Sequence, residues 1–281
     1  MRKRVSSIIN KTYMEITMET IKILREKCGA GIVDCKKALE ESGGNIEKAV
    51  EILRKKGIAK AAKRGDRAAC EGIIKIAANE AGNEGCIVQI SAETDFVVRN
   101  EQFQQFAEQV LELAKNKKPK NREELLALEM ENGTALENLH SLSGVIGEKL
   151  DIKNCDFVSA KTVAAYSHSG GKIGVLVALD KEGESELARE IAMQIAASDP
   201  AYIYPEDVPE EEIEKEKEIY RAQLLREGKP EQIIGKILPG KLDKYFEKTC
   251  LVKQEYIKDD KKRVQDILGG VKVEKFIRYS L

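Results

Sequence analysis

The sequence has no tryptophan, only two histidines and few aromatic residues, which make up 5% of its 281 positions. A folded core therefore has to be built mainly from Leu, Ile, Val and Ala. With 42% hydrophobic and 34% charged residues, the composition suits such a core and a well-solvated surface, and the length favours about two domains. No apolar run approaches the roughly 18 residues of a membrane span.

The sequence also offers few residues arranged to bind a metal or a cofactor. The six cysteines are scattered, none forms a CxxC pair, and only two histidines exist, so a zinc site is not expected. Apolar residues surround Cys86, and Cys35 lies on an expected helix, which is typical of small core residues. Reduced thiols are the default in the cytoplasm. We expect a cytoplasmic protein with no cofactor and no metal.

The first residues and the net charge exclude two further classes. The opening MRKRVSSIINKTY is basic, but no apolar segment follows, so a secretory signal is not expected. We interpret residues 1–13 as a disordered basic extension, or as the result of a start codon assigned too early, since Met14 begins a more orderly sequence. A net charge of −1 argues against coating nucleic acid by bulk electrostatics.

Three short helices are expected over residues 14–57. Gly29 interrupts the first helical pattern, and Gly43 follows the second. Asn45 is a good N-cap for the third helix, which we expect Gly57 to end. A unit of about 40 residues is near the lower limit for independent folding.

An internal repeat follows a basic, Ala-rich linker at 58–70. GNEGCIVQISAETDFVVRNEQFQQFAEQVLELA aligns loosely with GGKIGVLVALDKEGESELAREIAMQIAA. Both run from a Gly-rich turn through an apolar strand and a polar loop to an amphipathic helix, and a further strand-like run precedes each. Two core subdomains are therefore expected, at 71–150 and 151–281, with residues 115–150 mostly helical.

The loops of the two copies differ most. The second copy has DKEGE where the first has ETDFVVRNE. After the second copy, the three prolines of SDPAYIYPEDVP lead into a charged helical hairpin at 206–247. The final VEKFIRYSL is a strand-like run able to join the second sheet. The expected fold class is α+β.

Several segments together carry a family resemblance. They are LREKCGAGIVDCKKALEES with NIEKAVEILRKKG, then TDFV, YSHSGGKIGVLVAL and IAMQIAASDP. In this order and spacing, from about Ile16 to Tyr279, the chain resembles the elongation factor Ts family, the bacterial nucleotide exchange factors for elongation factor Tu. Cys28 stands where the family commonly has Thr. Members with a further C-terminal helix use it to grip the partner, so stopping at Leu281 suggests a smaller interface or a different balance of contacts.

The resemblance implies an architecture. A ubiquitin-associated-type three-helix domain would dock on the GTPase domain of elongation factor Tu. A two-subdomain core of antiparallel sheets with helices would follow, with the hairpin as a protruding coiled coil.

The resemblance also implies roles for the TDFV segment. Asp95 and Phe96 would push between helices of the GTPase domain and disturb its Mg²⁺ site, with Thr94, Val97 and Val98 in the same contact. Mg²⁺ requires near-ideal octahedral coordination, so a small displacement degrades it. The residues alone favour a strand-end turn whose Phe96 folds back onto the core.

Four further residues match partner-contacting positions of the family. His168 matches a contact to the partner's third domain, and the glycines at 170, 171 and 174 would allow close backbone approach. Cys35 and Lys36 match partner-facing positions on the second helix, and Ile257 falls loosely at an apolar contact. Without the resemblance, such a histidine is usually a partly buried polar residue and such a lysine is only solvated.

Other functions find less support in the sequence. No motif places a nucleophile beside a base, so no enzyme is indicated. No GxxxxGK[ST] loop occurs, so the chain is not expected to bind the nucleotide itself. The alternative is a ribosome- or RNA-associated protein acting through the basic linker Lys55–Arg67, with strongly salt-dependent binding. The sequence does not determine the oligomeric state.

Overall fold

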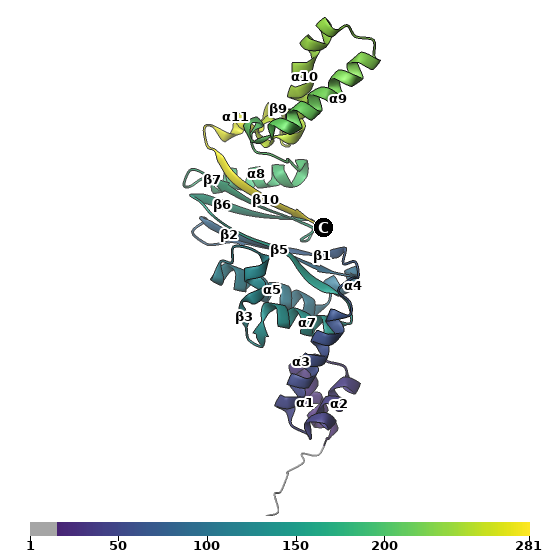
Figure 1. Ribbon diagram of the computed structural model, residues 1–281. Helices are drawn as coiled ribbons and strands as arrows, with labels where there is room; N and C mark the ends of the chain where they lie inside the picture. The colour runs from purple at the N-terminus through teal and green to yellow at the C-terminus, as the bar shows by residue number, and fades with distance from the viewer. Residues whose placement is uncertain (1–15) are drawn as a thin grey trace, which may run out of the picture. The chain divides into compact units, whose positions relative to one another are not determined.

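The computed structural model describes residues 16–281 (Figure 1). The chain divides into two compact units. Of the described residues, the first unit contains residues 16–71, Ser91–Phe106 and Leu126–Asp151. The second contains Gly72–Ile90, Ala107–Leu125 and Ile152–Leu281. Helices and antiparallel sheet occur together, which confirms the α+β class. The expectation for residues 1–13 lies outside the described residues, and the domain limits stay a prediction.

Three helices begin the first unit: α1 (Met18–Cys28), α2 (Ile32–Ser42) and α3 (Ile46–Ala62). Gly29 and Gly43 end the first two in the left-handed region, each at φ 66°, where glycine has no Cβ penalty. The side chain of Asn45 accepts a hydrogen bond from the Lys48 amide and caps α3. These three boundary predictions are confirmed. The helices enclose a small core of Ile21, Leu24, Ala30, Cys35, Ala38, Leu39 and Ala49.

The prediction that Gly57 ends the third helix is wrong, because α3 continues to Ala62. Gly57 instead lies where α3 crosses α7 (Ala135–Ile146). A Cβ on Gly144 of α7 would stand 2.4 Å from the Gly57 Cα. Gly144 is therefore the glycine that this crossing requires, whereas a Cβ on Gly57 itself would stand at an ordinary 3.5 Å from Ser141.

The region 115–150 is less helical than expected. It contains the end of α5 (Glu101–Lys117), then α6 (Arg122–Ala127) and α7. A short hairpin of β3 (Glu129–Met130) and β4 (Gly133–Thr134) interrupts them. The strand that follows, β5, starts at Leu150.

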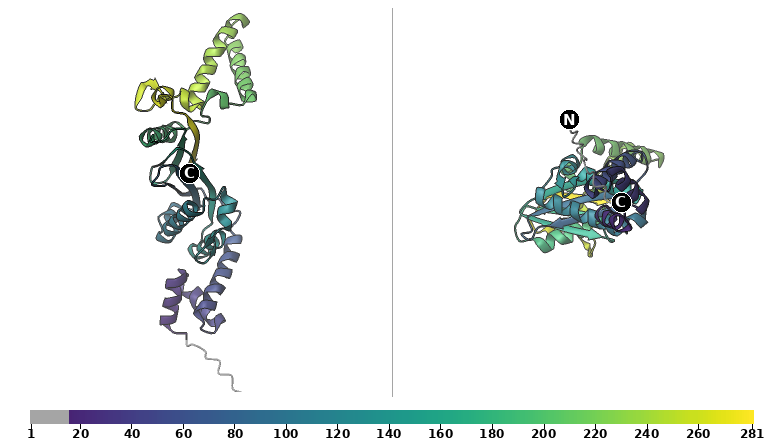
Figure 2. Two further views of the ribbon diagram at one scale, coloured as in Figure 1. Left: turned by 90° about the vertical axis from the view of Figure 1, so that its left-hand side faces the viewer. Right: turned by 90° about the horizontal axis from the view of Figure 1, so that it is seen from below.

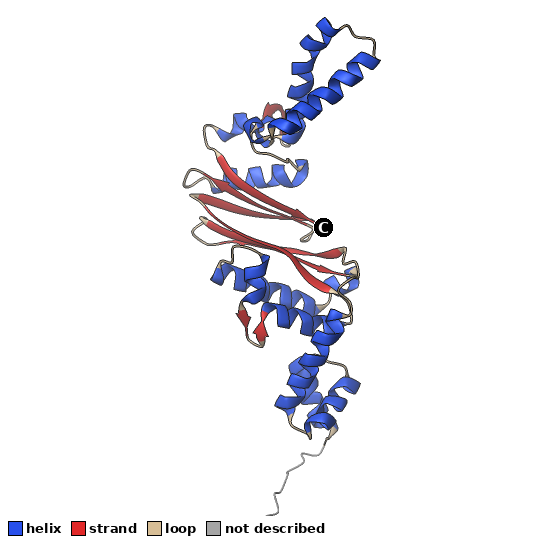
Figure 3. Cartoon of the chain, viewed as in Figure 1, coloured by secondary structure: helices blue, strands red, loops and turns tan. Residues whose placement is uncertain are grey.

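Two three-stranded sheets form the centre of the second unit (Figure 3). Their strands are β1 (Glu71–Ala78), β2 (Glu84–Ala92) and β5 (Leu150–Ser159) in one, and β6 (Thr162–His168), β7 (Ile173–Leu179) and β10 (Val273–Ser280) in the other. The orders are β1-β2-β5 and β10-β7-β6, and β7 pairs antiparallel with both neighbours. The prediction that the last strand joins the second sheet is confirmed.

The two sheets pack face to face through a shared apolar layer. It contains Ile74, Ile87, Val158, Val163, Leu176, Ala178 and Ile277. A Cβ on Gly174 would stand 2.5 Å from the Ile74 Cγ2, so glycine allows this close approach. Helix α5 covers the outer face of the first sheet, and α8 (Ser185–Ser198) that of the second (Figures 1 and 3).

A helical hairpin extends beyond these layers within the second unit (Figure 2). It consists of η1 (Pro205–Asp207), α9 (Glu210–Arg226) and α10 (Glu231–Thr249). Pro209 and Pro230 precede the two helices, and the Glu212 carboxylate accepts hydrogen bonds from the hydroxyls of Tyr202 and Tyr245 at its base. The chain continues through η2 (Leu251–Lys253), β8 (Glu255–Tyr256), β9 (Asp259–Arg263) and α11 (Val264–Leu268). Within residues 16–281, no helix combines the length and apolarity needed to cross a membrane.

Candidate functional site

The TDFV segment forms a one-turn helix, α4 (Asp95–Val98), between β2 and α5. Thr94 precedes it in extended conformation, and its hydroxyl oxygen accepts a hydrogen bond from the Val97 amide at 3.4 Å. At the other end, the Gln104 side chain donates to the Val98 carbonyl at 2.6 Å. Val97 is buried. Both ends of α4 and one of its side chains are therefore fixed to the body.

Phe96 points away from that body. It is 79% exposed, more than any other large hydrophobic side chain in residues 16–281. The interpretation in which the ring folds back onto the core is thus wrong. Burying a phenylalanine side chain is worth about 1.5–3 kcal/mol, and this gain is not realised within the chain. The ring can gain this free energy by packing against another molecule.

Asp95 lies beside the ring and pairs with a neighbour on the surface. Its carboxylate accepts from the Arg99 guanidinium at 2.7 Å, and the two side chains are 47% and 77% exposed. Exposed pairs of this kind contribute about 0–1 kcal/mol. Asp95 can therefore exchange Arg99 for groups of a partner at little cost.

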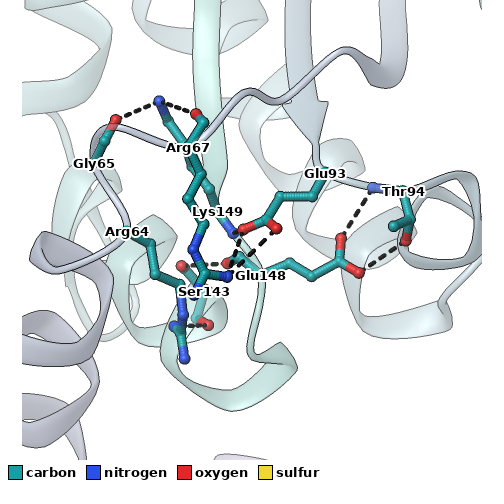
Figure 4. A network of polar contacts seen from close by, with 8 residues as sticks. All are labelled: Arg64, Gly65, Arg67, Glu93, Thr94, Ser143, Glu148 and Lys149. Atoms are coloured by element: carbon teal, nitrogen blue, oxygen red, sulfur yellow. Dashed lines mark hydrogen bonds and ion pairs between the residues drawn. The ribbon is translucent and has the colours of Figure 1, made fainter.

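A glutamate from a distant segment holds the start of α4 (Figure 4). The Thr94 amide donates to one oxygen of Glu148 at 3.0 Å, and the Thr94 hydroxyl donates to the other at 2.8 Å. The Ser143 hydroxyl in turn donates to the Glu148 backbone carbonyl at 2.6 Å. Hydrogen bonds to a carboxylate are stronger than neutral ones, so Glu148 orients the residue that caps α4.

A second glutamate extends this network to the turn after α3 (Figure 4). Glu93 accepts from the Lys149 amide at 2.6 Å and from the Arg67 guanidinium at 3.2 Å. The Lys149 ammonium donates to the carbonyls of Gly65 and Arg67 at 2.6 and 2.9 Å. The Lys149 amide, more than the Arg67 charge, holds the pKa of Glu93 below its ordinary value. Sequence reasoning missed Glu93, Glu148 and Lys149, because their partners lie far apart in the chain.

The start of α2 presents a second apolar surface in the first unit. Ile32 is 49% and Val33 65% exposed, and both line a shallow hollow of about 450 Å³ formed by residues 29–34 with Arg25 and Val145. Lys36 is exposed, with its ammonium 4.0 Å from Glu40. Cys35, in contrast, has no exposed surface. Cys35 can affect a partner only through the helix that it holds in place.

His168 ends β6 in the second unit and is exposed. Its Nδ1 lies 3.0 Å from the Tyr166 hydroxyl. The turn that follows has positive φ at Ser169, Gly170 and Gly171. A Cβ on Gly171 would stand 2.8 Å from the Ile73 side chain, and none would touch anything at Gly170. Gly171 and Gly174 thus lie against this chain's own Ile73 and Ile74, and the expected approach of a partner backbone stays a prediction.

Ile257 lies between β8 and β9 and is 47% exposed. Its amide donates to the Gln194 side chain at 2.9 Å. The neighbouring Lys258 ammonium lies 2.8 Å from the Glu190 carboxylate. The backbone at Ile257 is thus fixed to α8, while its side chain remains available on the surface.

Within residues 16–281, no group of three or more His, Cys, Asp or Glu side chains is arranged to hold a metal ion. The candidate contact residues are exposed side chains in each unit separately: those of α4 and the start of α2 in the first unit, and His168 and Ile257 in the second. Such an arrangement suits contact with another macromolecule.

Comparison with known proteins gives the chain its class. The family model described as Elongation factor TS matches residues 93–281. The chain is similar to the elongation factor Ts of Prosthecochloris aestuarii (strain DSM 271 / SK 413), with 43% identity over 284 residues, covering 95% of this chain and 99% of that relative. The protein is therefore a translation elongation factor. It belongs to the elongation factor Ts family.

Proposed function

We propose that the protein is a guanine nucleotide exchange factor that binds elongation factor Tu-GDP and promotes GDP release. It would do so by disturbing the Mg²⁺ and phosphate site of elongation factor Tu, which allows GTP to reload during translation elongation. The observation that carries this proposal is the exposed Phe96 ring on a turn fixed at both ends.

The physical argument rests on the coordination of Mg²⁺. The ion demands near-ideal octahedral oxygen geometry and bridges protein to nucleotide phosphate. A ring inserted behind a segment that carries a ligand has to move it only slightly to weaken coordination. Packed interiors change between discrete arrangements, so a small intrusion is amplified. Asp95 stabilises the displaced segment by accepting hydrogen bonds from its backbone.

The remaining surfaces supply affinity in this proposal. Ile32, Val33 and Lys36 contact the GTPase domain, and His168 and Ile257 contact other parts of elongation factor Tu. The chain forms no covalent intermediate and binds no nucleotide itself. Its effect is purely one of binding: it stabilises the partner conformation that holds GDP poorly, and GDP weakens its binding by the same ratio.

The test is release of a fluorescent GDP analogue from purified elongation factor Tu, followed by stopped-flow fluorescence in the absence of RNA. We expect the protein to accelerate release in proportion to its concentration until the partner is saturated. A release rate equal to that of elongation factor Tu alone would contradict the proposal.

The RNA-binding alternative is not adopted. Arg64 donates to the Ser143 carbonyl at 3.0 Å, and Arg67 pairs with Glu93. These contacts engage two of the cations of the basic segment with the body of the chain. Acceleration of GDP release in the absence of RNA would distinguish the nucleotide exchange function from the RNA-binding alternative.

A further inference from the structure

Two of the six cysteines lie beside each other in the first unit. The sulfur atoms of Cys28 and Cys35 are 4.0 Å apart, across the turn that joins α1 to α2. The Cys28 thiol donates to the Leu24 carbonyl at 2.9 Å, and the Cys35 thiol donates to the Ala30 carbonyl at 3.5 Å. A disulfide needs a sulfur separation of about 2.05 Å, so the two atoms must approach by about 2 Å.

The position of Cys28 makes this approach possible. It is the last residue of α1, and Gly29 follows in the left-handed conformation, so Cys28 can move with little loss of helical hydrogen bonds. Cys28 is half-buried, whereas Cys35 has no exposed surface. A reagent in solution therefore reaches Cys28 first, and Cys35 lies beside it, able to react in a second step.

We propose that Cys28 and Cys35 form a modification site, which low-molecular-weight disulfides convert into an intrachain disulfide. The Cys28 thiolate attacks a sulfur of the small disulfide, forms a mixed disulfide and releases one small thiol. Cys35 then gives up its proton and attacks the Cys28 sulfur, forming the intrachain bond and releasing the second small thiol. Two protein thiols are oxidised and one small disulfide is reduced to two thiols.

The environment keeps the pair reduced until such a reagent arrives. Burial, with the neighbouring Cys28 as the next cause, raises the pKa of Cys35 to about 12. Its thiol therefore stays protonated and unreactive near neutral pH. Cys35 reacts through the small fraction of its thiol that is ionised, and the mixed disulfide on the adjacent Cys28 gives it a target within the same turn.

The disulfide would act on the apolar surface at the start of α2. Ile32 and Val33 lie inside the eight-residue segment that the bond closes, and Gly29 lies against the Gln102 side chain of α5. Drawing the sulfurs together displaces this turn. If the proposed function holds, oxidation weakens binding to elongation factor Tu by about threefold or more.

The test uses the full chain carrying Cys70→Ser, which removes an exposed competing thiol. The protein is incubated with glutathione disulfide and glutathione at a series of ratios, and intact mass and peptide mapping identify the products. We expect loss of two hydrogens, with one Cys28–Cys35 bond that dithiothreitol reverses. Cys35→Ala should instead stop at the mixed disulfide on Cys28. Buried Cys86 and Cys155 serve as internal controls.

Absence of the Cys28–Cys35 bond at ratios that fully modify Cys70 in the wild-type protein would overturn the site, whatever the protein's function. Affinity for nucleotide-free elongation factor Tu is then measured for the oxidised and reduced forms, with Cys28→Ser treated identically. Weaker binding only in the oxidised form supports the proposal, and equal binding overturns the link to the partner. If the reduced protein neither binds elongation factor Tu nor accelerates release, the proposed function fails while the mass data still decide the site.

Discussion

The turns after β2 and after β7 occupy equivalent places in the two copies of the repeat, yet one exposes an apolar side chain and the other only polar ones. The first copy inserts α4 and exposes Phe96. The second passes through Asp180–Glu184, which contains no large hydrophobic residue. Both copies continue into a helix that covers a sheet, α5 or α8. The strand-to-helix scaffold therefore does not require an exposed ring, which favours the proposal that Phe96 contacts another molecule.

A threonine fixes each corner in a different way. Thr94 donates to Glu148 and caps α4. In the second copy, the Thr162 hydroxyl donates to the Lys181 carbonyl at 2.6 Å and accepts from the Glu184 amide at 3.4 Å. Both turns are thus held firmly, and the difference lies in what they present: an aromatic ring in one and charged side chains in the other.

Replacing the ring gives the largest expected effect. Phe96→Ala should slow stimulated GDP release by about thirtyfold, because loss of a hot-spot ring costs about 2 kcal/mol. The melting temperature should stay unchanged, since the ring is exposed. Stopped-flow release at a fixed concentration of the factor measures the first effect, and calorimetry the second. Leu136→Ala, at an exposed leucine of α7, is the matched control. An equal loss in both variants would mean that the α4 corner has no special role.

His168 should give the next largest effect, because it is the proposed contact of the second copy with elongation factor Tu and lies outside the charged Asp180–Glu184 turn. His168→Ala should weaken binding to nucleotide-free elongation factor Tu by about tenfold, or about 1.4 kcal/mol. Isothermal titration calorimetry measures this, and Lys181→Ala at the second corner should bind as wild type. A large fall in melting temperature with unchanged affinity would show that His168 only stabilises the fold.

The network behind α4 should have a smaller effect. In Glu148→Gln a neutral amide replaces the charged acceptor, so both hydrogen bonds to Thr94 weaken and stimulated release slows about fivefold, or about 1 kcal/mol. Amide hydrogen exchange at Val97 should become faster, because its cap is less well oriented. In a Phe96→Ala background the same substitution should add little further slowing. Fully additive losses would contradict a role for Glu148 in positioning the ring.

The smallest expected effect concerns Glu93 and pH. Its pKa is lowered in the folded protein, so its contribution to stability is complete above the unfolded value of about 4.3 and is lost as pH falls through the lower folded value. Glu93→Gln should be less stable than wild type at pH 7, by less than about 1 kcal/mol, and this difference should shrink as the pH falls below the unfolded pKa of about 4.3 and vanish below the folded pKa. Urea unfolding at pH 7 and in acid measures this difference in the free energy of unfolding, with Glu182→Gln in the turn after β7 as control. A gap that persists in acid would mean that the Glu93 charge contributes nothing.

Local signals made much of the fold predictable. The ends of α1 and α2 at Gly29 and Gly43 and the Asn45 cap depend on a few adjacent residues, and the sequence identifies them. Gly57 misled because α3 continues past it, packed on α7, a helix that lies far away in the chain. The strand β5 was missed because its Lys- and Glu-rich surroundings favour helix, and its place beside β2 depends on a non-local pairing.

In the candidate site, too, local features could be predicted from the sequence and long-range contacts could not. The TDFV segment lies at a strand-to-helix turn that the pattern itself predicts, so a corner at Asp95 and Phe96 could be anticipated. The exposure of the ring could not be predicted, because the same residues are compatible with a Phe96 side chain that folds back onto the core. Glu148, which fixes the corner, is 54 residues from Thr94 along the chain, and no periodicity connects them.

The most direct test of the central claim uses Mg²⁺ itself. Stimulated release of a fluorescent GDP analogue is measured by stopped flow for wild type and Phe96→Ala, with free Mg²⁺ and after chelation. If the ring acts by disturbing the Mg²⁺ site, the defect of about thirtyfold with Mg²⁺ should shrink severalfold after chelation, because the step that the ring assists has already occurred. Asp95→Ala should show a smaller defect with a stronger dependence on Mg²⁺ concentration. A Phe96→Ala protein that stimulates release at the wild-type rate with Mg²⁺ present would contradict the claim, as would a defect that chelation leaves unchanged.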